Sequence, residues 1–168
     1  MKKIAWVTML ILLLAGCSQK AVHRGTTGFI TQFVKDDQVL IGDVIYEIGH
    51  DTQLQTNEGE ALKKNDLRLG MKIQPFYEGD ISQAFPRRAR AKMLQVQQEP
   101  ADLQESAMIV NVLSQLRHNK DEHFIVTNVI HKPDEDAYVM DVMRRSNVDI
   151  GFKITVDEHN YEILFMEA

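Results

Sequence analysis

The sequence predicts a mainly β protein with an α+β second part: a small β-barrel, then a domain with one helix and an antiparallel sheet. Residues 25–98 contain short runs rich in β-branched and aromatic residues, separated by turn residues. A helical period begins only after Pro100, and further strand patterns follow it. Strands, then one helix, then strands favour two domains, at 25–98 and 101–168.

The first domain is expected to contain about five strands joined by short turns. The expected strands are Gly28–Val34, Val39–Ile48 with a break at Gly42-Asp43, Leu67–Tyr77 and Arg87–Gln97. Lys35–Gln38 and Glu78–Asp80 are typical turns, whereas Asp51–Lys64 is polar and has no clear strand pattern. Pro75 cannot donate a ladder hydrogen bond, so its strand should be an edge or bulged there.

About five short strands with a glycine at a bend fit a small Greek-key barrel. The OB-like type is the preferred interpretation, and an SH3-like barrel is the nearest alternative.

The second domain begins with an amphipathic helix over residues 102–119, close after Pro100, where proline is tolerated. One broad buried face is expected from the period of its apolar residues. That face comprises Leu103, Ala107, Val110 and Leu113, widened by Ile109, Val112 and Leu116.

Four strands should follow this helix, with turns at Lys132–Asp136 and Asp157–Asn160. They are Phe124–His131, Ala137–Met143, a third with Ile150, Phe152, Ile154 and Val156 on one face, and Tyr161–Met166. The helix should cover one face of this meander. Cystatin-like and PepSY-like folds share this common outline.

The N-terminal residues have the pattern of an export signal. Lys2 and Lys3 precede an uncharged apolar stretch, Ile4–Ala15, that is too short to span a bilayer. The following Leu14-Ala15-Gly16-Cys17 resembles the bacterial lipobox. That resemblance implies a signal peptide over residues 1–16, diacylglycerol on Cys17 and a tether over residues 17–24. An ordinary signal peptide with a chance cysteine, or an uncleaved anchor, is the alternative.

The cysteine count and the charge are consistent with anchoring through lipid. Cys17 is the only cysteine, so the mature chain is expected to have no disulfide and no cysteine metal ligand. Without Lys2 and Lys3, acidic residues exceed basic ones by seven. Anionic lipid and nucleic acid both repel such a body, so two acyl chains must provide the membrane attachment. No nucleic-acid partner is expected.

Residues 25–98 also resemble the YobA-type family of small exported domains of Gram-positive bacteria. The resemblance lies in Asp66–Ile73, Tyr77–Ile81, Phe85-Pro86 and the alanine-rich Arg87–Ala91. It implies an OB-like fold, supplies no catalytic residues and favours the extracytoplasmic face of a cell membrane. In a Gram-negative host, Ser18 after the lipidated cysteine would favour the outer membrane.

One candidate binding surface stands out, a basic row made by Arg88, Arg90 and Lys92. These side chains should share one face of an alternating strand and could bind an anionic ligand, such as an envelope polymer. The alternative is a solvent face paired with local carboxylates.

No catalytic residue, metal ligand or cofactor is predicted. Asp121–His123 and Asp157–His159 contain ligand types for a metal, but both lie at expected turns, where charged residues are commonly solvated. No histidine pair has zincin spacing, and no serine lies in a nucleophile elbow.

The favoured function is a membrane-anchored envelope lipoprotein that acts as a binding or accessory module for an envelope polymer or a protein partner. One alternative is an envelope hydrolase whose site lies between the two domains. Another is a protein-interaction subunit that uses a sheet edge.

Overall fold

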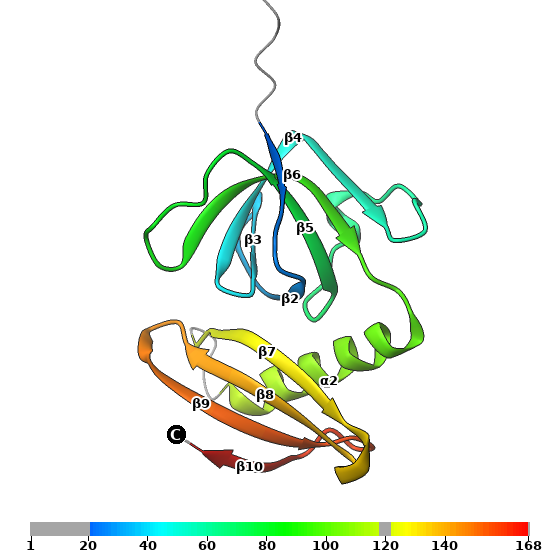
Figure 1. Cartoon of the computed structure of the whole chain (residues 1–168), viewed down its shortest axis with the longest axis vertical. Helices are drawn as coiled ribbons and strands as arrows, with labels where there is room; N and C mark the ends of the chain where they lie inside the picture. The colour runs from blue at the N-terminus through cyan, green and yellow to red at the C-terminus, as the bar shows by residue number, and fades with distance from the viewer. Residues whose placement is uncertain (1–20, 118–121, 168) are drawn as a thin grey trace, which may run out of the picture.

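The computed structural model describes residues 21–117 and 122–167. Figure 1 shows a β-barrel at one end of the molecule and, at the other, a second sheet with one α-helix beside it. The described residues are mainly strands, in a closed five-strand barrel followed by a single helix and a second sheet. In this form the predicted fold class is confirmed. The predicted signal peptide, Cys17, the end of the predicted helix at 118–119 and Asp121 lie outside the described residues.

The barrel closes because strand β5 pairs with β2 on one side and with β6 on the other. Its sheet order is β1-β5-β2-β3-β4-β6, and β5 also pairs with β6. The β4–β6 pair is parallel, whereas the other pairs are antiparallel. The elements are β1 (Val22–Arg24), β2 (Gly28–Lys35), β3 (Gln38–Ile41), β4 (Val44–Thr56), the 3-10 turn η1 (Lys64–Asp66), β5 (Lys72–Glu78) and β6 (Arg87–Val96).

Two barrel strands differ from their predicted bounds. The chain does break at Gly42, which has a φ of +56°, but β4 then continues to Thr56 through a segment whose polarity predicted no strand. Residues Met93–Val96 of β6 pair with that segment and provide partners for its backbone hydrogen-bonding groups. Conversely, the expected strand from Leu67 starts only at Lys72, after the η1 turn. The strand does have a register shift just after Pro75, between Phe76 and Tyr77.

Inward-facing apolar side chains fill the barrel, as alternation requires. On β6, Ala89 and Ala91 are buried, while Arg88 and Arg90 point outward. The buried core is Ile30, Val39, Ile41, Val44, Tyr46, Ile48, Leu67, Ile73, Ala89, Ala91, Leu94 and Val96.

The second half has one helix and a four-stranded antiparallel sheet of order β10-β9-β8-β7. The helix begins at Pro100, and the Asp102 carboxylate accepts a hydrogen bond from the Glu99 N–H at 3.3 Å. The elements are α2 (Pro100–Leu116), β7 (Phe124–Lys132), the 3-10 turn η2 (Pro133–Glu135), β8 (Ala137–Arg144), β9 (Asn147–Asp157) and β10 (Ile163–Glu167).

The predicted buried face of the helix is only partly correct. Leu103 is 55% exposed, Val110 is 47% exposed and Ala107 is also exposed. The buried residues are Met108, Ile109, Val112, Leu113 and Leu116. Since apolar residues surround much of this helix, the period alone could not fix its orientation toward the sheet.

The barrel and the second half pack against each other, which the sequence left open. Leu40 and Ile45 of the barrel form a buried cluster with Ile125 of β7. Lys72 forms ion pairs with Asp102 at 2.8 Å and with Glu105 at 2.7 Å, both on α2. Two arginines add contacts to β2: Arg117 donates to the Thr31 carbonyl at 3.2 Å and Arg145 to Gln32 Oε1 at 2.7 Å.

Within residues 21–117 and 122–167, no helix has the length and apolar character needed to cross a membrane.

Candidate functional site

The predicted basic row lies on the outer face of β6, but carboxylates neutralise most of it. Arg90 binds Asp51 at 2.8 Å, and its hydrogen bond holds the pKa of that carboxyl below the usual value. Lys92 lies 3.0 Å from Glu78 and 3.8 Å from Asp51. The guanidinium of Arg88 lies 3.5 Å from Gln38 Oε1. Anion binding by this row therefore stays a prediction, and its electrostatic support is reduced.

The acidic segment Asp157–His159 has structural partners. Asp157 accepts hydrogen bonds from the Asn160 and His159 N–H groups at 3.0 and 2.9 Å, which lowers its pKa. Glu158 lies 3.0 Å from His131 Nε2, and His131 stacks on Tyr138. The described ranges contain no group of three or more His, Cys, Asp or Glu residues arranged to hold a metal.

A sheet edge is present at β10, which pairs only with β9 among the described strands. Three apolar side chains near its end are exposed to solvent: Leu164 is 47%, Phe165 66% and Met166 55% exposed. Such an edge is available for strand addition.

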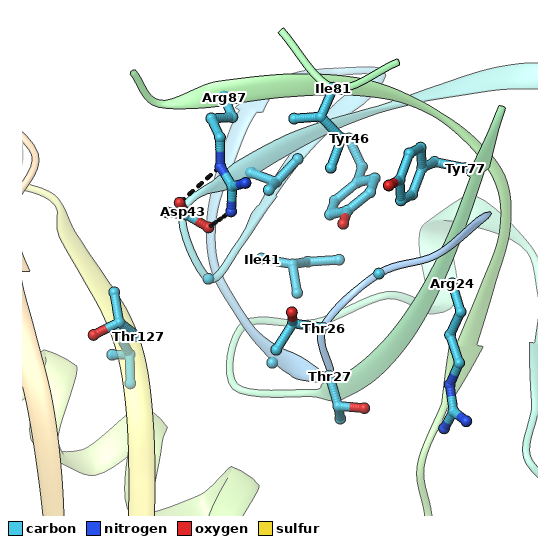
Figure 2. A pocket seen from close by; sticks show the side chains of 15 residues that line it. Arg24, Thr26, Thr27, Ile41, Asp43, Tyr46, Tyr77, Ile81, Arg87 and Thr127 are labelled. Atoms are coloured by element: carbon cyan, nitrogen blue, oxygen red, sulfur yellow. Dashed lines mark hydrogen bonds and ion pairs between the residues drawn. The ribbon is translucent and has the colours of Figure 1, made fainter. Parts of the chain in front are cut away.

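A pocket of about 430 Å³ lies between one end of the barrel and β7, and charged and hydroxyl side chains line it. We call it the mouth pocket. Figure 2 shows Asp43 and Arg87 on one side, Tyr46 and Tyr77 on the other, and Thr127 of β7 at the rim. Barrel and second sheet thus both contribute to its wall.

The Asp43–Arg87 ion pair is fixed by the local backbone. Asp43 lies in the turn between β3 and β4, and its carbonyl accepts a hydrogen bond at 3.0 Å from the N–H of Arg87, the first residue of β6. The guanidinium then donates Nε to Oδ2 at 2.9 Å and Nη2 to Oδ1 at 2.7 Å. Hydrogen bonding to Asp43 raises the pKa of Arg87. The side chains remain 43% and 30% exposed, so a ligand can reach them.

Two tyrosines form the opposite wall, with ring centroids 6.5 Å apart. Tyr46 is only 1% exposed, and its burial raises the pKa of the hydroxyl to about 12. A Cβ on Gly25 would lie 2.6 Å from this hydroxyl, so the adjoining loop requires glycine. The Tyr46 hydroxyl consequently stays neutral at ordinary pH and can both donate and accept a hydrogen bond.

A buried glutamine that the sequence analysis missed holds the loop beside the tyrosines. Gln74 is 4% exposed, and its Nε2 donates to the Gly25 carbonyl at 2.7 Å. Its Oε1 accepts from Arg24 Nε at 2.8 Å and from Thr27 Oγ1 at 2.7 Å. The only sequence signal was a glutamine at an inward position of a strand, where buried polar groups need partners. The Arg24 guanidinium is thereby directed away from the ion pair of the mouth pocket (Figure 2).

The charged and hydroxyl groups of this pocket can hold a ligand through hydrogen bonds. A hydrolase between the domains would need converging carboxylates or histidines. Among the described residues that line the mouth pocket, Asp43 is the one carboxylate and there is no histidine. Asp43 is held by Arg87, and the raised pKa of Tyr46 makes its hydroxyl a weak acid.

Comparison with protein-family models, curated proteins and solved structures found no match to this chain.

Replacing Tyr46 with Phe should reduce the loss of stability at alkaline pH. The pKa of Tyr46 is about 12 in the folded chain and 10.0 in the unfolded chain. The stability that comes from the buried neutral hydroxyl is therefore fully present below pH 10 and is lost as the pH rises toward 12. The free energy of unfolding of the wild type should fall by about 2–3 kcal/mol more than that of Tyr46→Phe over this range. Urea denaturation at several pH values measures the difference, and parallel pH profiles would contradict it.

Proposed function

We propose that this protein is a lipid-anchored lipoprotein of the bacterial envelope that binds an envelope polymer through the mouth pocket. The anchor rests on the lipobox-like Leu14–Cys17. The observation that carries the binding function is the pocket itself, which joins an accessible Arg–Asp pair to neutral hydroxyls. Two chain segments far apart in sequence come together to build it.

We also propose that the barrel is of the OB type. Counting from β2, its strands follow the order 1-2-3-5-4-1, with a parallel pair between the third and the fifth. The proposed kinship with the YobA-type family rests on the sequence features given above. OB barrels often bind polymers on the face of their second and third strands. Here the outward Leu40 and Ile45 of those strands are buried against Ile125, so the ligand site belongs at the open mouth instead.

Changing Cys17 to Ala should move the protein from the membrane fraction to the soluble fraction. Two acyl chains give stable attachment, whereas one gives only marginal binding. Fractionation of cells that produce the wild type or the variant measures this, and Ser18→Ala is the matched control that should stay with the membrane. Retention of the Cys17→Ala protein in the membrane fraction would refute the lipid anchor.

Filling the mouth pocket should abolish binding to the envelope polymer. Thr127 is exposed on β7 at the pocket rim, so Thr127→Trp places a large ring there without disturbing the core. Asn128→Trp is the matched control, since Asn128 is also exposed on β7 but does not line the pocket. Purified full-length protein in detergent is mixed with insoluble cell-wall material and sedimented.

The wild type and Asn128→Trp should sediment with the wall material, and Thr127→Trp should lose at least tenfold in affinity. Equal sedimentation of all three proteins would exclude the pocket as the binding site. Loss of binding only when Arg88, Arg90 and Lys92 are together changed to Gln would assign the ligand to the basic row instead.

A further inference from the structure

The charge of the mouth pocket limits what it can bind. Asp43 and Arg87 are joined by two hydrogen bonds, at 2.7 and 2.9 Å, so their charges cancel. Arg24 also lines the pocket, but its Nε donates to Gln74, and its guanidinium points away from Asp43 and Arg87 (Figure 2). An anionic ligand that binds Arg87 would be repelled by the neighbouring Asp43 carboxylate. A cation that binds Asp43 would be repelled by the Arg87 guanidinium. A neutral ligand avoids both repulsions.

The same pair still offers hydrogen bonds of both kinds side by side. A guanidinium has five N–H donors, and two of those on Arg87 are used by Asp43. The remaining N–H donors of Arg87 lie next to lone pairs of the Asp43 carboxylate that accept no hydrogen bond from Arg87. Two adjacent hydroxyls fit such an edge, because each hydroxyl can accept from the guanidinium and donate to the carboxylate.

The rest of the pocket fits a molecule with one polar edge and one apolar face. The partly exposed Ile81 lies at the upper side of the pocket in Figure 2, and the exposed Thr26 adds a hydroxyl. The volume of about 430 Å³ lies within the usual range for small-molecule sites, roughly 300–1,000 Å³. Pyranose rings combine adjacent hydroxyls with an apolar C–H face.

We propose that the mouth pocket recognises a neutral sugar unit through two adjacent hydroxyls held by Asp43 and Arg87. This inference rests on the proposed polymer-binding function and adds the chemical class of the recognised unit. The exposed Thr26 then supplies a third hydrogen-bonding group, and the partly exposed Ile81 contacts the apolar face of the ring.

The test titrates neutral sugars into isotope-labelled full-length protein in detergent and follows amide chemical shifts. The probes are the methyl glycosides of glucose, galactose and mannose, and N-acetylglucosamine oligomers. Saturable shifts should be confined to pocket residues, with a dissociation constant on the order of 1 mM for a single unit. Glucuronic acid, which carries a carboxylate, should bind at least tenfold more weakly.

Arg87→Lys is the decisive variant, because it keeps the charge beside Asp43 and removes the planar fork. It should weaken sugar binding at least tenfold. Arg90→Lys is its matched control, since Arg90 also lies on β6 and binds an aspartate, Asp51, but outside the mouth pocket. Its sugar affinity should equal that of the wild type.

The two proposals fail in different ways. Absence of saturable shifts for every neutral sugar, or tighter binding of glucuronic acid, overturns the sugar inference. Wall sedimentation that still depends on Thr127 would then leave the polymer-binding function intact. Loss of that dependence together with the sugar shifts would overturn both.

Discussion

Replacing Gly70 with Ala is expected to lower the free energy of unfolding by about 2–5 kcal/mol. Gly70 has a φ of +82°, a conformation that disfavours any residue with a Cβ. A Cβ there would lie 2.4 Å from Val110 Cγ2 and 2.7 Å from the Ser106 carbonyl oxygen. Because that carbonyl belongs to the backbone of α2, the helix itself would have to move away from the barrel.

Gly79→Ala is the matched control for this change. Gly79 has a φ of +71°, but a Cβ there would meet nothing within 4 Å. Gly79→Ala should therefore lower the free energy of unfolding only by the cost of a positive φ for alanine, about 1–2 kcal/mol. Urea denaturation of both variants measures the excess that comes from the helix contact. Equal losses would show that the close approach of Gly70 to α2 adds nothing to stability.

Truncating Ile125 to Ala should cost about 2–5 kcal/mol, the usual range for a fully buried Ile. Ile125 is 0% exposed and packs between Leu40 and Ile45 of the barrel. Its loss leaves a cavity where the two halves meet. Ile130→Ala on the same strand is the control, since Ile130 is 48% exposed and should change stability by no more than about 0.5 kcal/mol.

A second measurement distinguishes a weakened junction from a general loss of stability. Hydrogen exchange should accelerate in β7 and β3 together in Ile125→Ala, because both strands face the altered cluster. If only β7 loses protection, or if Ile125→Ala and Ile130→Ala unfold at the same urea concentration, the cluster does not hold the two halves together.

The features that the sequence could predict are those with a local pattern. The alternation of Arg88, Ala89, Arg90 and Ala91 predicts one outer and one inner face of β6, and the structure has both. Pro100 marks the start of the helix, and turn residues separate the four strands after it. Each of these signals depends on residues that are close together in the sequence.

The remaining features depend on partners far away in the chain. The polar end of β4 is a strand because β6 pairs with it, which no local pattern reports. The mouth pocket was not predicted at all. Asp43 and Arg87 are 44 residues apart, and Gln74 lies 49 residues from Gly25. Their roles exist only after the barrel has closed.

The buried amide of Gln74 has a mechanical consequence. Through the same oxygen it holds Arg24, at the end of β1, and Thr27, just before β2. In a molecule pulled toward the membrane from its N-terminal side and held by a polymer at the mouth, tension enters through β1. The pairing of β1 with β5 and the hydrogen bonds of Gln74 are then the first contacts to bear the load. The strength of the tether under load would then be set by a few hydrogen bonds, not by the stability of the fold.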